Sequence, residues 1–123
     1  MNDAALLFAF IEVESAFNPK AFLNDRNGGS YGLMQLDYQT AMDRGYVGSP
    51  ANLYDPATNI KYGCAILDWL AADLTKHSMY SVENLAAAFN SGLAHVIGGG
   101  TDAPYSAKII AALAKWRAIF PAP

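Results

Sequence analysis

One glutamate stands in an apolar stretch near the start of the chain, where a carboxyl group could do acid chemistry. Residues 6–17 read Leu-Leu-Phe-Ala-Phe-Ile-Glu-Val-Glu-Ser-Ala-Phe, and as a helix this stretch is hydrophobic on nearly every side. Glu14 continues the row of Leu7 and Ile11 at helical spacing, whereas Glu12 lies about 200° away around the helix. Burial among apolar side chains raises the pKa of a carboxyl group, which suits a general acid near neutral pH. The alternative is a helix-end glutamate whose carboxyl group reaches water.

The composition indicates a compact globular protein with one core. The chain has 123 residues, of which 53% are hydrophobic and 15% charged, and this favours a single domain over residues 1–123. The net charge of −3 and the scattered Lys and Arg residues give no reason to expect nucleic-acid binding. The longest apolar run, residues 4–11, is much shorter than the roughly 20 residues of a membrane span. It also lacks the basic start and cleavage site of a signal peptide. We therefore expect no membrane span. The protein is also expected to be a monomer.

The residues that commonly bind metals are too few and too far apart to predict a metal site. Cys64 is the only cysteine, which excludes an internal disulfide, and it is expected to be a small buried hydrophobic residue. His77 and His95 are widely separated from it and from each other in the sequence. No metal site is expected from these residues.

Capping and turn residues divide the chain into about five helices joined by short loops. The expected helices run from Asp3 to Asn18, from Gly32 to Arg44, from Pro56 to Lys76, from Ser81 to Asn90 and from Asp102 to Phe120. Ser30 is a candidate cap for the second of them. Residues 46–55 are expected to be a loop, and a small hairpin fits residues 24–31, which are rich in Gly and Asn. The predicted fold class is all-α.

Four ordered pieces of sequence, followed by a tyrosine, match the pattern of a known family. The pieces are Glu14-Ser15, Gly32-Leu33-Met34-Gln35, Asp55-Pro56-Ala57-Thr58-Asn59-Ile60 with Gly63, and Ala88-Phe89-Asn90-Ser91-Gly92, and the tyrosine is Tyr105. In this order, they make the chain resemble the lysozyme-like catalytic domain of soluble lytic transglycosylases and goose-type lysozymes, enzymes that cleave the glycan of peptidoglycan. The resemblance extends from Leu6 to Trp116 and implies a lysozyme-like, all-α single domain.

The resemblance also implies roles for individual residues. Glu14 would act as general acid and then as general base. The residues that would bind substrate are Ser15, Gly32, Met34, Gln35, Phe89, Asn90 and Tyr105. Phe89 stands where the family usually has a tyrosine, so a hydroxyl group is missing there.

Several of these residues also have a plain structural interpretation. Met34 could fill the core, and Asn90 could be a helix C-cap next to Gly92. Ser15 could be an ordinary helix-end serine and Tyr105 a half-exposed helix aromatic. Asn59 is expected to secure a helix start rather than to contact sugar.

The number of carboxyl groups separates two possible reactions. Ordinary glycoside hydrolysis uses two of them. Lytic transglycosylases, as a family, use a single glutamate, with assistance from the N-acetyl group of the substrate, and form a 1,6-anhydro sugar. Goose-type enzymes hydrolyse, and aspartates near the Gly32–Gln35 segment are proposed to assist; Asp25 and Asp37 lie in such positions. Asp25 could equally be a solvated turn residue, and Asp37 could stabilise a helix start.

The favoured prediction is a peptidoglycan lytic transglycosylase that cleaves the MurNAc–GlcNAc β-1,4 bond and leaves a 1,6-anhydroMurNAc end. The alternatives are a goose-type muramidase, assisted by Asp25 or Asp37, and an inactive glycan-binding or assembly module. None of these functions implies a cofactor. The expected partner is the peptidoglycan glycan strand, and the expected location is the periplasm or cell envelope, reached by export or by phage delivery.

Overall fold

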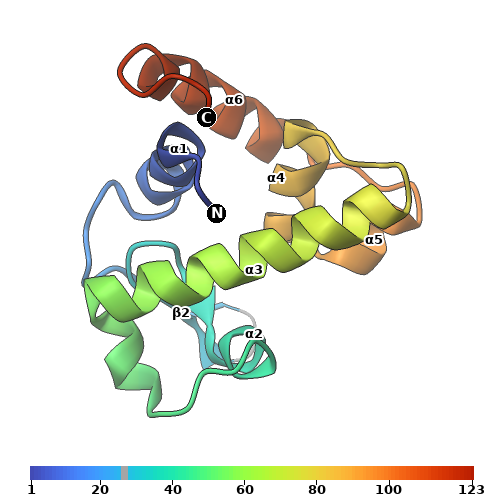
Figure 1. Cartoon of the computed structure of the whole chain (residues 1–123). Helices are drawn as coiled ribbons and strands as arrows, with labels where there is room; N and C mark the ends of the chain where they lie inside the picture. Colours follow the sequence, from blue (N-terminus) through green and yellow to red (C-terminus); the bar gives the residue numbers. More distant parts are fainter. Residues whose placement is uncertain (26–27) are drawn as a thin grey trace. The chain divides into compact units, whose positions relative to one another are not determined.

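The computed structural model describes residues 1–25 and 28–123. This part of the chain contains six α-helices and a three-stranded antiparallel sheet, joined by loops (Figure 1). The α-helices are α1 (Ala4–Ser15), α2 (Tyr38–Asp43), α3 (Pro56–Lys76), α4 (Val82–Ser91), α5 (Leu93–Ile97) and α6 (Ala103–Arg117). The other elements are β1 (Phe22–Leu23), β2 (Ser30–Tyr31), β3 (Leu36–Asp37) and the 3-10 helix η2 (Pro50–Tyr54). The predicted mostly helical fold with a small hairpin near residues 24–31 is confirmed.

The second helix begins at Tyr38, so the predicted start at Gly32 is wrong. Gly32 and Gln35 have φ angles of 75° and 50°, in the left-handed region, which a right-handed helix cannot contain. Residues 32–35 therefore form a turn, and β3 then pairs with β2. The N-cap of α2 is Asp37, whose side chain accepts a hydrogen bond from the Thr40 backbone at 2.8 Å. Ser30, the predicted cap, lies in β2 instead.

Two short helices occur where connections were predicted. η2 lies within the expected loop of residues 46–55, begins at Pro50 and buries Leu53 completely. α5 follows α4 after Gly92, whose φ of 101° turns the chain, and it buries Val96. Each helix has only five residues, so neither shows a sustained periodic pattern in the sequence.

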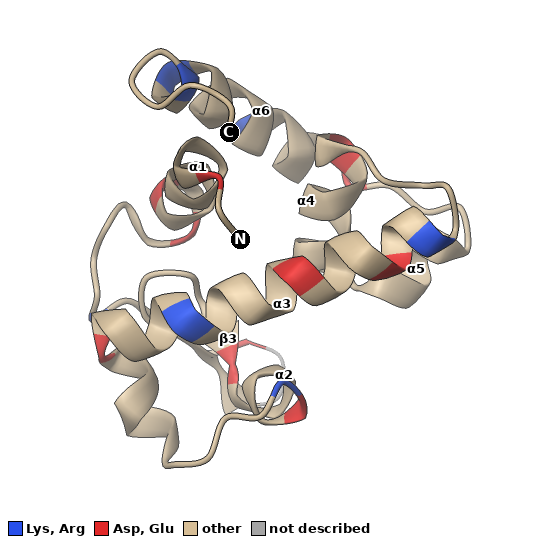
Figure 2. Ribbon diagram, in the orientation of Figure 1, with Lys and Arg blue, Asp and Glu red and all other residues tan. Residues whose placement is uncertain are grey.

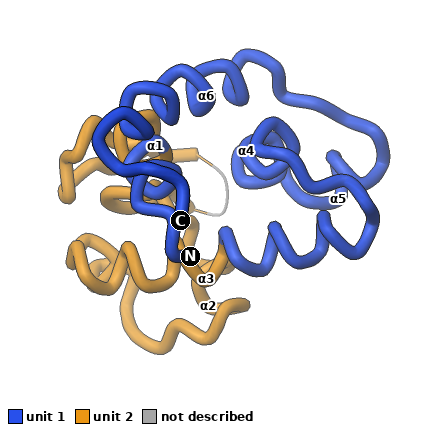
Figure 3. The backbone as a smooth tube through the Cα atoms, turned by 45° about the horizontal axis from the view of Figure 1, so that its top comes forward, with its two compact units in different colours: residues 1–9, 67–123 blue, residues 10–66 orange. Residues whose placement is uncertain are grey.

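The described residues form two compact units, which Figure 3 shows in different colours. One unit contains residues 1–9 and 67–123, and the other contains residues 10–66. Helices α1 and α3 each continue from one unit into the other.

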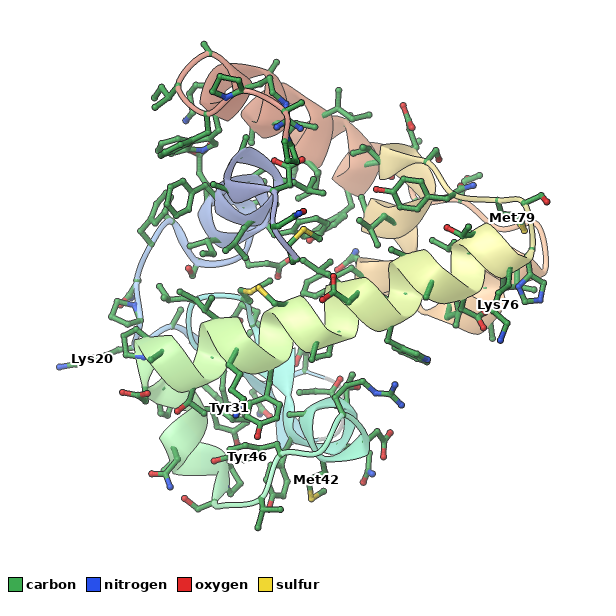
Figure 4. All side chains as sticks on the ribbon, in the orientation of Figure 1. Lys20, Tyr31, Met42, Tyr46, Lys76 and Met79 are labelled. Atoms are coloured by element: carbon green, nitrogen blue, oxygen red, sulfur yellow. The ribbon has the colours of Figure 1, made fainter. Side chains whose placement is uncertain are left out.

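The unit of residues 10–66 contains the sheet and a cluster of tyrosines. In the sheet, Phe22 pairs with Tyr31, and Tyr31 pairs with Leu36. The core beside the sheet consists of Ala41, Tyr46 and Leu53, with Tyr31, Tyr38 and Tyr62 packed against it. Figure 4 labels Tyr31 and Tyr46 in the space below the first half of α3. The hydroxyl groups of Tyr38 and Tyr46 donate to the backbone oxygens of Gly48 and Ser49, at 2.7 and 2.6 Å, so the cluster also holds the loop before η2.

The unit of residues 1–9 and 67–123 is built around α4 and α6. The buried hydrophobic residues of these two helices are Leu85, Ala86, Ala87, Ala88, Ile109 and Ala112. The ring of Phe8 packs edge-on against Trp116 and Phe120, with 5.2 Å between centroids in both pairs. The guanidinium group of Arg117 donates to the two carboxylate oxygens of Asp3 at 2.7 and 2.8 Å, across 114 positions of sequence. This ion pair joins the start of the chain to the end of α6.

Replacing Asp3 with Asn is expected to make stability less dependent on pH. Asn keeps the ability to cap α1, where Asp3 accepts from the Leu6 backbone, but it carries no charge. The hydrogen bond from Arg117 lowers the pKa of Asp3 below its ordinary 3.8. A carboxyl group with a lowered pKa stabilises the fold above its unfolded pKa, and this contribution is lost as the pH falls through the folded pKa.

Asp3→Asn should therefore unfold at a lower temperature than the wild type at neutral pH. The difference should disappear as the pH falls well below 3.8. Thermal unfolding followed by circular dichroism at a series of pH values measures both midpoints. A constant difference at every pH would contradict the prediction.

Candidate active site

Glu14 and Ser15 occupy the last turn of α1, and both are partly buried. The Ser15 hydroxyl donates to the Ile11 backbone oxygen at 3.1 Å, within the same helix. Directly after Ser15, Ala16 and Phe17 have φ angles of 51° and 62°. Consecutive left-handed residues other than glycine are uncommon, and such strain often occurs beside functional sites.

Asn59, in the first turns of α3, holds the turn formed by residues 32–35. Its side chain is completely buried. Its Oδ1 accepts from the Met34 backbone N–H at 2.9 Å, and its Nδ2 donates to the backbone oxygens of Tyr31 and Leu53, both at 2.8 Å. Asn59 therefore supports the Gly32–Gln35 segment from inside the fold, which is a wider role than the predicted one of securing a helix start.

Gly32 and Met34 have close contacts within the fold. A Cβ atom at Gly32 would lie 2.6 Å from Asn59 Nδ2 and 2.8 Å from the Leu53 oxygen, and the φ of Gly32 is 75°. Met34 is completely buried, and its side chain packs where a Cβ of Gly63 would lie. Both residues, predicted to bind substrate, thus have structural roles, and the core-filling alternative for Met34 explains its position.

Gln35 is partly buried and holds its own turn in place. Its Nε2 donates to the backbone oxygens of Ala21 and Gly32, at 3.1 and 3.0 Å. Both hydrogens of Nε2 are used in these bonds, which leaves Oε1, an acceptor, as the atom through which this amide would contact a ligand. The group that Gln35 could recognise is therefore a hydroxyl or an N–H.

Asp25 and Asp37, the candidate second carboxylates, both take part in local hydrogen bonds. Asp25 Oδ1 accepts from the Ser30 hydroxyl at 2.7 Å. Asp37 caps α2, and its oxygens accept from the Thr40 backbone and hydroxyl, both at 2.8 Å. The helix-start alternative for Asp37 describes what this carboxylate does in the structure.

The remaining candidates belong to α4 and α6 in the other unit. Phe89 and Asn90 are in the last turns of α4 and Tyr105 is in the first turn of α6, and all three are partly buried. Asn90 Nδ2 donates to Asp102 Oδ2 at 2.7 Å, and the Ser91 hydroxyl donates to the same oxygen at 2.7 Å. These hydrogen bonds lower the pKa of the Asp102 carboxyl group below its ordinary value. Sequence reasoning predicted Asp102 as a helix start but missed its contact with Asn90.

The predicted site residues are divided between the two units. The unit of residues 10–66 contains Glu14, Ser15, Asp25, Gly32, Met34, Gln35 and Asp37. The other unit contains Phe89, Asn90 and Tyr105. Residues 26–27, which lie inside the predicted hairpin, are outside the described part of the chain.

Charged and metal-binding groups are dispersed. Figure 2 shows Lys and Arg on separate elements, among them α3 and α6. In residues 1–25 and 28–123, no group of three His, Cys, Asp or Glu side chains could hold a metal ion. None of the helices in this part of the chain is both long enough and apolar enough to cross a membrane.

The order and spacing of these segments agree with one family. The model of the transglycosylase SLT domain family matches residues 1–108, which include Glu14, the Gly32–Gln35 turn, Asn90 and Tyr105. The chain is a member of the transglycosylase SLT domain family.

Two solved structures have a fold similar to that of this SLT domain. A lytic transglycosylase Slt from Pseudomonas aeruginosa, solved as an inactive mutant, matches with a TM-score of 0.78 and 21% identity. The 70 kDa soluble lytic transglycosylase of Escherichia coli matches with a TM-score of 0.74 and 26% identity. Each match covers 94% of this chain, but only 21% of the Pseudomonas chain and 22% of the Escherichia coli chain. The SLT domain thus has the lysozyme-like fold and spans about a fifth of the length of either protein.

Proposed function

We propose that this SLT domain cleaves the glycan strands of peptidoglycan as a lytic transglycosylase. It would break the MurNAc–GlcNAc β-1,4 bond and leave a 1,6-anhydroMurNAc end. The observation that carries the proposal is the family match over residues 1–108, a range that includes Glu14 in the last turn of α1.

Glu14 is the proposed acid and base. Cleavage of a glycosidic bond requires a proton on the departing oxygen, and a carboxyl group that is neutral near pH 7 can supply it. The partly buried position of Glu14 favours this neutral form. The Pseudomonas protein with the similar fold was solved as an inactive mutant with glutamine in place of one glutamate.

The proposed reaction needs no second carboxylate and no water. Glu14 gives its proton to the glycosidic oxygen while the bond from that oxygen to C1 breaks, and the substrate's N-acetyl oxygen stabilises C1. The C6 hydroxyl group of the same MurNAc then forms a bond to C1 and returns a proton to Glu14. No atoms are gained or lost in this reaction. One glycan strand becomes two, and one of these ends in a 1,6-anhydro ring.

The hydrogen bonds of the two aspartates favour this route over hydrolysis. A second catalytic carboxylate must reach the bond or its attacking water. Both oxygens of Asp37 accept from Thr40 at the start of α2, and Asp25 accepts from Ser30. A catalytic role for Asp37 would have to be compatible with its hydrogen bonds to Thr40, which hold both oxygens at the start of α2.

The other family positions are proposed to bind the sugar chain. Gln35 would accept through Oε1, because its N–H groups donate to Ala21 and Gly32. Asn90 would bind an N-acetyl or hydroxyl group, and Ser15, Phe89 and Tyr105 would also contact the glycan. Peptidoglycan lies in the periplasm or cell envelope, so the proposed activity would take place there.

Mass spectrometry of fragments released from purified peptidoglycan tests the proposal. The intact protein is expected to release muropeptides one water lighter than reducing-end products, and these should resist reduction by borohydride. Fragments with the full mass of reducing-end products, which borohydride can reduce, would instead identify a hydrolase. Asp25 would then be the candidate second carboxylate. A folded sample that releases no fragments would overturn the proposed activity in favour of glycan binding alone.

A further inference from the structure

A carboxylate before α6 contacts the end of α4 in a way that the family pattern does not explain. Asp102 Oδ2 lies 2.7 Å from Asn90 Nδ2 and 2.7 Å from the Ser91 hydroxyl. Asp102 occupies the N-cap position of α6, and the backbone of Tyr105 in that helix is among the groups that stabilise its carboxylate. The carboxylate also accepts from the side chains of Asn90 and Ser91 in α4, which a capping role alone does not require.

The chemistry of this contact fixes the orientation of the Asn90 side chain. A carboxamide carries an acceptor oxygen on one arm and a donor NH₂ group on the other, and the two arms have nearly the same shape. An ionised carboxylate can only accept hydrogen bonds. The Asn90 arm that contacts Asp102 must therefore be the NH₂ group, so Oδ1 is directed away from Asp102.

We propose that Asp102 is a positioning residue that locks Asn90 in this orientation, so that Asn90 meets the glycan with an acceptor oxygen. The group that Asn90 recognises would then be a donor, either the N–H of an acetamido group or a sugar hydroxyl. This inference rests on the proposed function, because it assigns a role to Asn90 in binding the same substrate. Gln35 would also contact the glycan through an acceptor, since its Nε2 donates to backbone oxygens.

The test is Asp102→Asn, which keeps the shape of the side chain and removes its charge. An asparagine at this position can donate or accept, so either orientation of Asn90 satisfies the contact. If the two orientations are about equally populated, only about half of the molecules present the acceptor oxygen to the glycan, and apparent affinity falls by that fraction. We expect KM for glycan strands to rise about twofold, with a much smaller change in kcat.

A second readout does not depend on activity. In the wild type, the side-chain NH₂ of Asn90 should show nitrogen and proton NMR shifts typical of a donor to a carboxylate, and Asn90→Asp assigns these signals by their loss. The same signals should move in Asp102→Asn. If Asp102→Asn does not fold, Asp102→Ser replaces it in both measurements, because serine is also favoured at a helix N-cap.

Two further variants serve as comparisons. Asp73→Asn removes a carboxylate from α3 that lies beside His77, and it should leave KM and the Asn90 signals as in the wild type. Ser91→Ala removes the other donor to Asp102 Oδ2 but leaves the bond from Asn90, so its KM should rise less than that of Asp102→Asn.

The possible outcomes separate this inference from the proposed function. An inactive wild type would overturn the proposed function, and the NMR comparison would then decide the orientation of Asn90 alone. An active wild type, with unchanged KM and unchanged Asn90 signals in Asp102→Asn, would overturn the inference while the proposed function stands. A raised KM with moved Asn90 signals would support both.

Discussion

Glu14→Gln is expected to abolish glycan cleavage while the protein remains folded. Glutamine has nearly the same shape as glutamic acid but cannot deliver a proton to the departing oxygen. Loss of a general acid typically lowers the rate by about 100- to 10,000-fold, and here the same group would also act as the base. Release of muropeptides per unit time, compared with that of the wild type, measures the loss.

The matched control for this variant is on the same helix. Glu12→Gln makes the same chemical change two positions earlier in α1, and it should retain activity. Circular dichroism and the thermal midpoint show that both variants are folded. Binding of glycan strands to Glu14→Gln should persist, since only the proton is removed. Wild-type rates in Glu14→Gln would contradict the assignment of Glu14.

Asn59→Ala is expected to be the most destabilising of the proposed substitutions. The change leaves the Met34 N–H and the backbone oxygens of Tyr31 and Leu53 without their Asn59 partner, and the bonds to Met34 and Leu53 are buried. Each buried polar group without a partner costs about 1–3 kcal/mol. We expect the free energy of unfolding to fall by about 3–5 kcal/mol, which is a large part of the stability of a typical domain.

Urea unfolding of Asn59→Ala and of a surface control measures this loss. Asn52→Ala is the control, because Asn52 is exposed and lies in η2, and its effect should be below about 0.5 kcal/mol. Activity of Asn59→Ala should fall as well, even where the protein is folded, because Asn59 holds the turn that carries Gln35. Equal stability of the two variants would mean that Asn59 does not support this turn.

Local signals in the sequence predicted the elements whose ends depend on adjacent residues. Asp55-Pro56 predicted the start of α3 at Pro56, where the helix begins. The family pieces led to the lysozyme-like fold and to Glu14 as the candidate acid. A cap or a proline acts on its immediate neighbours, so such signals are readable without the rest of the fold.

The features that the sequence did not predict depend on distant partners. The turn at residues 32–35 was expected to be helical, but its shape is held by Asn59, which bonds Met34 across 25 positions. The contact between Asn90 and Asp102 spans 12 positions and leaves no local pattern. For Asp37 the sequence left a catalytic and a helix-start role open, and only the positions of the Thr40 donors show which hydrogen bonds it makes.

The ion pair between Asp3 and Arg117 has a consequence for the order in which the protein can fold as it is synthesised. Residues 10–66 form a continuous segment, so their unit can assemble as soon as this segment has left the ribosome. Residues 1–9 are made before this segment, but their unit includes α6, and Arg117 follows Asp3 by 114 positions. Residues 1–9 therefore wait until α6 has been made, and closing so long a loop adds an entropic barrier to that step.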